Sequence, residues 1–155
     1  MKFVLPVVAV LALSACATEK AATTTACAPP PKDLVKQDIS PGTGDDSVRP
    51  RTAVLVSYTG WLYDDCKPGH KGEKFDTSEG RATPFGFMVG AGSVIKGWDE
   101  GLIGMKEHGV RRLVIPPDKA YGSQQKGPII KPNSTLVFDV ELLKILTHAD
   151  EAPKK

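Results

Sequence analysis

The chain has 155 residues, of which 41% are hydrophobic and 25% are charged, and its formal net charge at pH 7 is +2. This length and composition fit one globular domain with a single hydrophobic core. A net charge so close to zero argues against a polyanionic partner, and no basic stripe with interleaved aromatic residues is present, so we expect no binding of nucleic acid.

An export signal is predicted by the first sixteen residues, MKFVLPVVAVLALSAC. Lys2 precedes an apolar run that is shorter than the roughly 20 residues of a membrane-spanning helix, and small residues follow before Cys16. The letters LSAC resemble the lipobox of bacterial lipoproteins, in which the cysteine is acylated and becomes the new N-terminus. The alternative is an ordinary secretory signal that ends near a cysteine.

The lipoprotein interpretation places the chain in the bacterial cell envelope. We expect a signal peptide over residues 1–15 and a lipid anchor on Cys16. Ala17 follows the cysteine, and by resemblance to known lipoprotein sorting signals a residue other than aspartate there implies the outer membrane, with the domain facing the periplasm.

A flexible tether is predicted over residues 16–32. After the cysteine the chain reads ATEKAATTTACAPPPK, which is rich in Ala, Thr and Pro and has no apolar periodicity. Such a segment cannot bury a core, and as a flexible coil its ends would lie on the order of 20 Å apart. It would let a domain stand off a membrane surface.

The folded domain is predicted over residues 33–147, followed by a polar tail over residues 148–155. Four stretches alternate apolar and polar residues, as antiparallel strands with one solvated face do: RTAVLVSYTGWLY, PFGFMVG, GVRRLVIP and STLVFDVELLKIL. Before the third stretch, Val94, Trp98, Leu102 and Met105 recur at helical spacing. We therefore predict the α+β class, with a curved antiparallel sheet wrapped around one short amphipathic helix.

Six motifs resemble, in order and spacing, those of the FKBP-type peptidyl-prolyl cis-trans isomerases: VSYTGWL, KFDTS, PFGFMVG, VIKGWDEGLIGM, PPDKAYG and TLVFDVELL. Six linked motifs are far more specific than any one of them. The resemblance implies an FKBP-like fold and an enzyme that accelerates rotation about X-Pro bonds without covalent catalysis. The substrate's proline ring would lie on the indole of Trp98.

The resemblance also implies the residues of the site. The catalytic residues would be Asp76, Tyr121 and Phe138, with the Tyr121 hydroxyl donating to a ligand carbonyl and Asp76 orienting the site without transferring protons. The substrate-binding residues would be Tyr58, Phe75, Arg81, Phe85, Val94, Ile95, Trp98, Ile129 and Ile130, among which Ile95 would donate its main-chain N–H. The implied partners are proline-containing polypeptides and macrolide inhibitors of the rapamycin type.

Three features depart from the family pattern. The flap, residues 121–130 (YGSQQKGPII), carries Lys126 where many members have histidine, so the sequence preference stays open. The stretch YDDCKPGHKGEK before Phe75 is longer than in the smallest members and forms a polar bulge that contains Cys66. Dimeric relatives have a long helical N-terminal domain, whereas the tether here is short, so we expect a monomer.

Two further cysteines, Cys27 and Cys66, remain once Cys16 is assigned to the lipid. An oxidising compartment lets disulfides persist, and the tether is long enough to bring Cys27 back to the domain. A disulfide also requires the two Cα atoms within about 7 Å. Whether this pair forms therefore stays open.

Other kinds of site find little support in the sequence. His70, His108 and His148 are scattered without ligand spacing and are interpreted as solvated surface residues, so we expect neither a metal ion nor a cofactor. No Cys-x-x-Cys pair occurs, and no serine or cysteine is visibly paired with a base.

Two functions of different classes remain. The first is an active prolyl isomerase that assists the folding of exported proteins. The second is an FKBP-like binding module or chaperone of the cell envelope, with the pocket retained but little turnover. The joint presence of Asp76, Trp98, Tyr121 and Phe138 favours the first.

Overall fold

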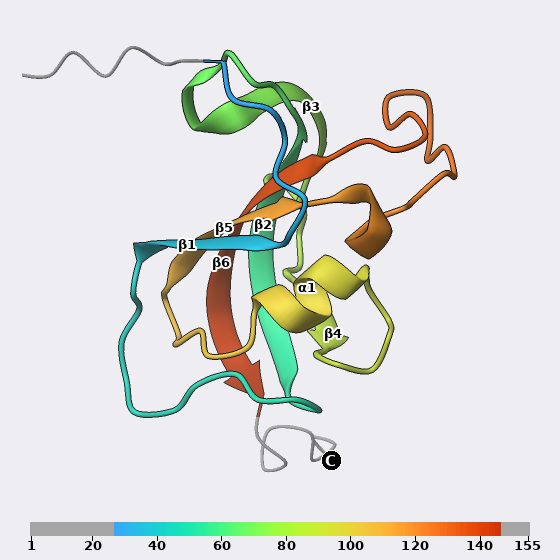
Figure 1. Ribbon diagram of the computed structural model, residues 1–155. Helices are drawn as coiled ribbons and strands as arrows, with labels where there is room; N and C mark the ends of the chain where they lie inside the picture. Colours follow the sequence, from blue (N-terminus) through green and yellow to red (C-terminus); the bar gives the residue numbers. More distant parts are fainter. Residues whose placement is uncertain (1–26, 147–155) are drawn as a thin grey trace, which may run out of the picture.

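The structure is a computed structural model that describes residues 27–146 (Figure 1). The signal peptide over residues 1–15, Cys16 and the tail over residues 148–155 lie outside this range. One sheet contains six strands: β1 (Val35–Ser40), β2 (Ala53–Tyr63), β3 (Lys71–Thr77), β4 (Phe85–Met88), β5 (Val110–Ile115) and β6 (Leu136–Leu146).

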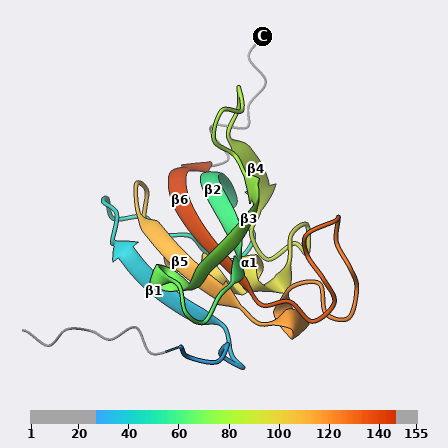
Figure 2. The ribbon, with the colours of Figure 1, turned by 90° about the horizontal axis from the view of Figure 1, so that it is seen from above.

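All the strand pairs are antiparallel, in the order β1-β5-β6-β2-β3. The long strand β2 pairs with β6 on one side, while its other side is shared by β4 near the start and β3 near the end. Figure 2 shows β1, β5, β6 and β2 following one another as a curved layer. The predicted α+β fold with a curved antiparallel sheet is therefore confirmed.

The concave face of this sheet carries the core. In β2 the side chains of Val54, Val56 and Tyr58 are buried, and the residues between them are more exposed. In β6, Phe138 and Val140 point inward while Glu141 is exposed. This period of two is the one that the sequence predicts.

One α-helix, α1 (Lys96–Gly101), lies against this face, and Figure 1 shows it in front of β2. Its two glycines allow a close approach to β5, because a Cβ on Gly97 would overlap the side chain of Ile115 and a Cβ on Gly101 would lie 2.8 Å from Leu113. Small residues thus bring a weak helix-forming sequence to the sheet, where packing stabilises it.

The regular helix is shorter than its apolar periodicity predicts. Of the four residues at helical spacing, only Trp98 lies inside α1, whereas Leu102 is its C-cap and Met105 is buried in the following loop. The chain turns at Gly104, where φ is +82°. No helix within residues 27–146 is long and apolar enough to cross a membrane.

The end of the predicted tether that the structure describes, residues 27–32, is attached to the domain. A disulfide joins Cys27 to Cys66, with a Cα–Cα distance of 4.3 Å. The Tyr63 hydroxyl donates a hydrogen bond to the Ala28 carbonyl at 2.8 Å. His70 was expected to be a solvated surface residue, but its ring stacks on Tyr63 at a centroid distance of 4.7 Å, and its Nδ1 is buried. That expectation is wrong for His70, because its ring packs against Tyr63 at the end of β2 and is partly buried there.

Candidate active site

A cavity of about 260 Å³ opens where β2, β3, β4, β6, α1 and the flap meet. Apolar and aromatic side chains dominate its wall, and a few polar groups lie at its edge. The lining residues are Tyr58, Phe75, Asp76, Phe85, Ser93, Val94, Ile95, Trp98, Tyr121 and Phe138. An apolar concave site with a few convergent polar groups is typical of small-ligand pockets.

The floor of the cavity is the indole of Trp98, which is 4% exposed. Tyr58 and Phe138 pack against it edge to face, at centroid distances of 5.0 Å and 5.3 Å. Such perpendicular contacts between aromatic rings are favourable beyond the area that they bury. The indole N–H of Trp98 is buried and has no hydrogen-bond partner in the part of the chain that the structure describes.

The wall consists of further aromatic rings. Phe75, from β3, meets Phe138 at 5.5 Å, and Phe85, from β4, meets Tyr58 at 5.8 Å. The rings therefore come from separate strands and are held by contacts with one another. Phe87 extends this cluster beneath the floor, 5.6 Å from Trp98, although it does not line the cavity.

Asp76 organises the polar edge of the cavity. Its carboxylate accepts hydrogen bonds from the Tyr58 hydroxyl at 2.7 Å, from the Arg81 guanidinium at 2.9 Å and from the Thr77 N–H at 2.8 Å. Burial, followed by the hydrogen bond to Asp76, raises the pKa of Tyr58 to about 12. Tyr58 therefore stays protonated at physiological pH and continues to donate to Asp76.

Besides the indole N–H of Trp98, the two donors that were expected from the sequence have no partner within residues 27–146. Neither the main-chain N–H of Ile95 nor the hydroxyl of Tyr121 forms a hydrogen bond there. Burial, and then the negative charge of Asp76, raise the pKa of Tyr121, so its hydroxyl also keeps its proton. The cavity thus presents the Ile95 N–H and the Tyr121 hydroxyl free above an apolar floor, where a bound carbonyl oxygen would accept from them.

Nine of the residues expected from the sequence line this cavity, and the structure adds Ser93. Arg81 contacts Asp76 from outside the lining. The structure does not bring Ile129 and Ile130 to the cavity wall. The Lys126 N–H donates to the Ile130 carbonyl at 2.9 Å, which closes the flap, and the Ile130 side chain packs in the core at 5% exposure.

Ser93 was not expected at the site, although it stands directly before the motif VIKGWDEGLIGM. Phe87 shares the face of Phe85 in the alternating stretch PFGFMVG, and the structure adds that it packs against Trp98.

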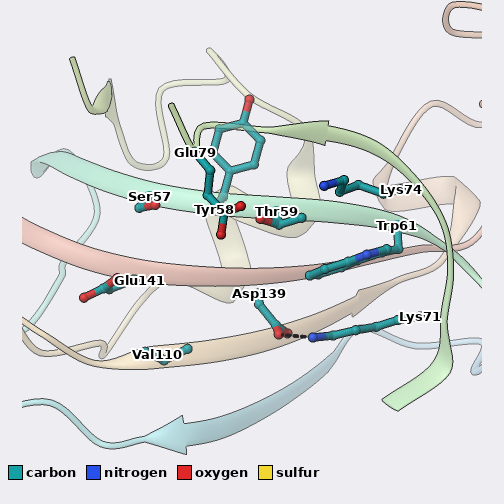
Figure 3. Close-up of a pocket in the computed structure, with 10 residues that line it drawn as sticks. All are labelled: Ser57, Tyr58, Thr59, Trp61, Lys71, Lys74, Glu79, Val110, Asp139 and Glu141. Carbon is teal, nitrogen blue, oxygen red and sulfur yellow. Dashed lines mark ion pairs between the residues drawn. The ribbon is translucent and has the colours of Figure 1, made fainter. Parts of the chain in front are cut away.

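A second, polar groove of about 480 Å³ lies on the outer face of the sheet (Figure 3). Trp61 lies in it with the Lys71 ammonium 4.1 Å from its ring centroid, and Lys71 pairs with Asp139 at 2.6 Å. Burial disfavours ionisation of Asp139, but hydrogen bonds from Arg112 and Lys71 outweigh it and lower the pKa of that carboxyl. These contacts tie β3 to β5 and β6, so the groove has a structural explanation.

A metal site has weak support among the described residues. Asp64, Asp65 and Cys66 bring potential ligand atoms within 4.8 Å of one another. The sulfur of Cys66 is bonded to Cys27, however, and a cysteine binds metal ions effectively only as a free thiolate.

Comparison with known proteins agrees with the geometry. Residues 44–143 match the family of FKBP-type peptidyl-prolyl cis-trans isomerases. An "FK506-binding protein" of Neisseria meningitidis serogroup A is 45% identical over 112 residues, which cover 72% of this chain and 95% of that protein. The "Peptidyl-prolyl cis-trans isomerase Fkbp12" of Drosophila melanogaster is 46% identical over 107 residues, which cover 69% of this chain and 93% of that protein.

A solved structure is also similar. The crystal structure of FkpA from Escherichia coli matches with a TM-score of 0.60 and 43% sequence identity, covering 72% of this chain and 47% of the FkpA chain. With this fold, this aromatic cavity and these relatives, the chain belongs to the FKBP-type peptidyl-prolyl cis-trans isomerases.

Proposed function

We propose that this isomerase acts on X-Pro bonds of exported proteins, as a monomer held at the bacterial outer membrane by a lipid on Cys16. The N-terminal export pattern and its lipobox-like LSAC support this location. The observation that carries it is the Cys27–Cys66 disulfide. Disulfides persist in oxidising compartments and are rare in the cytosol, so the bond favours a place outside the cytoplasm.

The proposed mechanism needs no covalent step. Rotation about a peptide bond faces a barrier of about 18–20 kcal/mol, because twisting removes the amide resonance. In the aromatic cavity the substrate amide would lose the water that stabilises its planar, charge-separated form. The Ile95 N–H and the Tyr121 hydroxyl, both free in the structure, would donate to substrate carbonyl oxygens and favour the twisted geometry. Asp76 would position Tyr58 and would not transfer a proton.

Macrolides are proposed as inhibitors that occupy the same cavity. The similar proteins from Neisseria meningitidis are named for binding FK506. A rapamycin-like macrolide would place an apolar ring on Trp98 and its carbonyls near the two free donors. It would therefore compete with proline-containing polypeptides for one site.

Tyr121→Phe separates the catalytic role of a hydroxyl from a structural one. Since this hydroxyl makes no hydrogen bond within residues 27–146, its loss should leave the free energy of unfolding within about 0.5 kcal/mol of wild type. Loss of a donor to the twisted amide should lower kcat/KM by about three- to tenfold. Peptide isomerisation assays and urea denaturation measure the two quantities.

Tyr63→Phe is the matched control, because its hydroxyl donates to the Ala28 carbonyl, away from the cavity. This variant should lose about 1 kcal/mol of unfolding free energy and keep its kcat/KM. A Tyr121→Phe variant with full activity would remove this hydroxyl from the mechanism.

Cys16→Ala tests the lipid anchor. In cells fed a clickable fatty acid, the wild-type protein should take up label and sediment with the membranes. The Cys16→Ala protein should remain an unlabelled precursor that migrates more slowly, because its signal peptide is not removed by the lipoprotein route. Wild-type protein that takes up no label would contradict the anchor, while its isomerase activity would be unaffected by that outcome.

A further inference from the structure

A hollow of about 560 Å³ adjoins the aromatic cavity whose floor is Trp98, which is called the proline cavity from here on. The two share a wall made by Ser93, Val94, Ile95 and Tyr121. The hollow is completed by Gly92, Lys96, Asp99, Asp118, Ala120 and Lys126. A polypeptide whose proline ring occupies the cavity extends away from it on both sides, so the hollow is placed to receive a side chain next to the proline. This step rests on the cavity being the site of turnover.

Lys126 lines the hollow next to the shared wall. Its ammonium lies 5.7 Å from the centroid of the Tyr121 ring, which faces both the cavity and the hollow. Its backbone is fixed by the hydrogen bond from the Lys126 N–H to the Ile130 carbonyl. The side chain is exposed and forms no ion pair with any carboxylate of residues 27–146.

Of the two carboxylates that line the hollow, only Asp99 is engaged with the protein itself. Both oxygens of Asp99 accept main-chain N–H groups, from Gly90 at 2.7 Å and from Gly92 at 3.0 Å. Asp118 is exposed and forms no hydrogen bond or ion pair within residues 27–146, because its neighbour Lys119 pairs with Glu100 instead. The second lysine of the hollow, Lys96, is exposed and unpaired within the described range, as Lys126 is.

We propose that Lys126 is a specificity-determining residue that selects substrates with an acidic residue next to the proline. Its free ammonium at the rim attracts a carboxylate and repels a second cation. Lys96, in the same hollow, is a second unpaired cation, and the exposed Asp118 opposes part of the attraction, which keeps the selection moderate. An exposed ion pair changes an equilibrium by up to about fivefold, so the selection is moderate and falls with rising salt.

Two peptide series test this proposal. In one the residue before the proline is Glu, Gln or Lys, and in the other the residue after it is varied in the same way. Isomerisation is measured by NMR exchange, which avoids the preferences of a coupling protease. Wild type, Lys126→Gln and Lys126→Glu are compared at low and high salt. Lys131→Glu is the matched control, since Lys131 is also exposed, lies just past the flap and lines neither cavity nor hollow.

The wild type should favour Glu over Lys by about threefold at one of the two positions, and Lys126→Glu should reverse the order. Lys126→Gln should reduce the preference, and Lys131→Glu should leave it as in wild type. Equal rates for Glu and Lys peptides in the wild type, or the same preference in all four proteins, would overturn the proposal while leaving the isomerase intact. No turnover of any peptide would instead contradict the active site on which it rests.

Discussion

Arg111→Met should lower the free energy of unfolding by about 2–4 kcal/mol, because it leaves several polar groups without partners. Arg111 is 8% exposed although it carries a charge. Its guanidinium donates to the carbonyl of Gly101, the last residue of α1, at 2.8 Å and to that of Ile103, just after the helix, at 3.0 Å. A six-residue helix is too short to be stable alone. The same side chain that holds β1 to β5 therefore also fixes the helix that carries the cavity floor.

The partner of Arg111 across the strands is Asp38, at 2.5 Å. The hydrogen bond from Arg111, opposed in part by burial, lowers the pKa of Asp38 below its usual range. The folded state thus favours the ionised carboxylate, so this contribution to stability is present at neutral pH. It is lost as the pH falls through the lowered pKa.

Urea denaturation followed by circular dichroism measures the loss. Arg49→Met is the matched control, because Arg49 is exposed and its side chain forms no hydrogen bond or ion pair within residues 27–146. Its effect should stay below about 0.5 kcal/mol. If the two arginine variants unfold at the same urea concentration, Arg111 does not cap α1. The difference between the two at acidic pH should shrink, since Asp38 is then protonated.

Much of the fold is predictable from the sequence, because it depends on alternation along each strand. The inward set of β6, from Leu136 to Leu142, follows directly from period two. The length of α1 does not follow in the same way. Its apolar spacing continues through Met105, but the helix ends at Gly101. There Arg111, from β5, donates hydrogen bonds to the carbonyls of Gly101 and Ile103. Local periodicity does not reveal such a distant partner.

The structure brings expected residues to the cavity from the strands, from α1 and from the loop before it, but from the flap it brings only Tyr121. On a strand or a helix, the regular backbone sets the direction of each side chain, as it does for Phe75 in β3, Trp98 in α1 and Phe138 in β6. Ile130 belongs to a loop, where its carbonyl accepts a hydrogen bond from the Lys126 N–H and the Ile130 side chain packs in the core. The pairing of Cys27 with Cys66 also stayed open, since chain length gives reach but not the relative position of two Cα atoms.

Replacing both Cys27 and Cys66 with serine should lower the free energy of unfolding by about 4 kcal/mol, through the entropy regained by the unfolded chain. The two residues are 39 positions apart, and the loop that they close contains β1 and β2. Without the bond, the segment at Ala28 would be held mainly by its hydrogen bonds with Tyr63 and Asp65. None of the residues that line the proline cavity belongs to this segment, so kcat/KM at 25 °C should stay close to wild type.

The measurement compares wild type and the double serine variant, each with and without dithiothreitol, in urea. Reductant should bring the wild type to the stability of the variant and should leave the variant unchanged, which separates the covalent bond from the serine substitutions. Reduction of the wild type must be confirmed by showing that its thiols are free. If its urea midpoint then does not change, the disulfide contributes nothing to the free energy of unfolding. If the loss occurs with kcat/KM intact, the bond stabilises the attachment of residues 27–32 to the domain and does not act on the chemistry. Residues 27–32 would then be held covalently to the domain only while the surroundings stay oxidising.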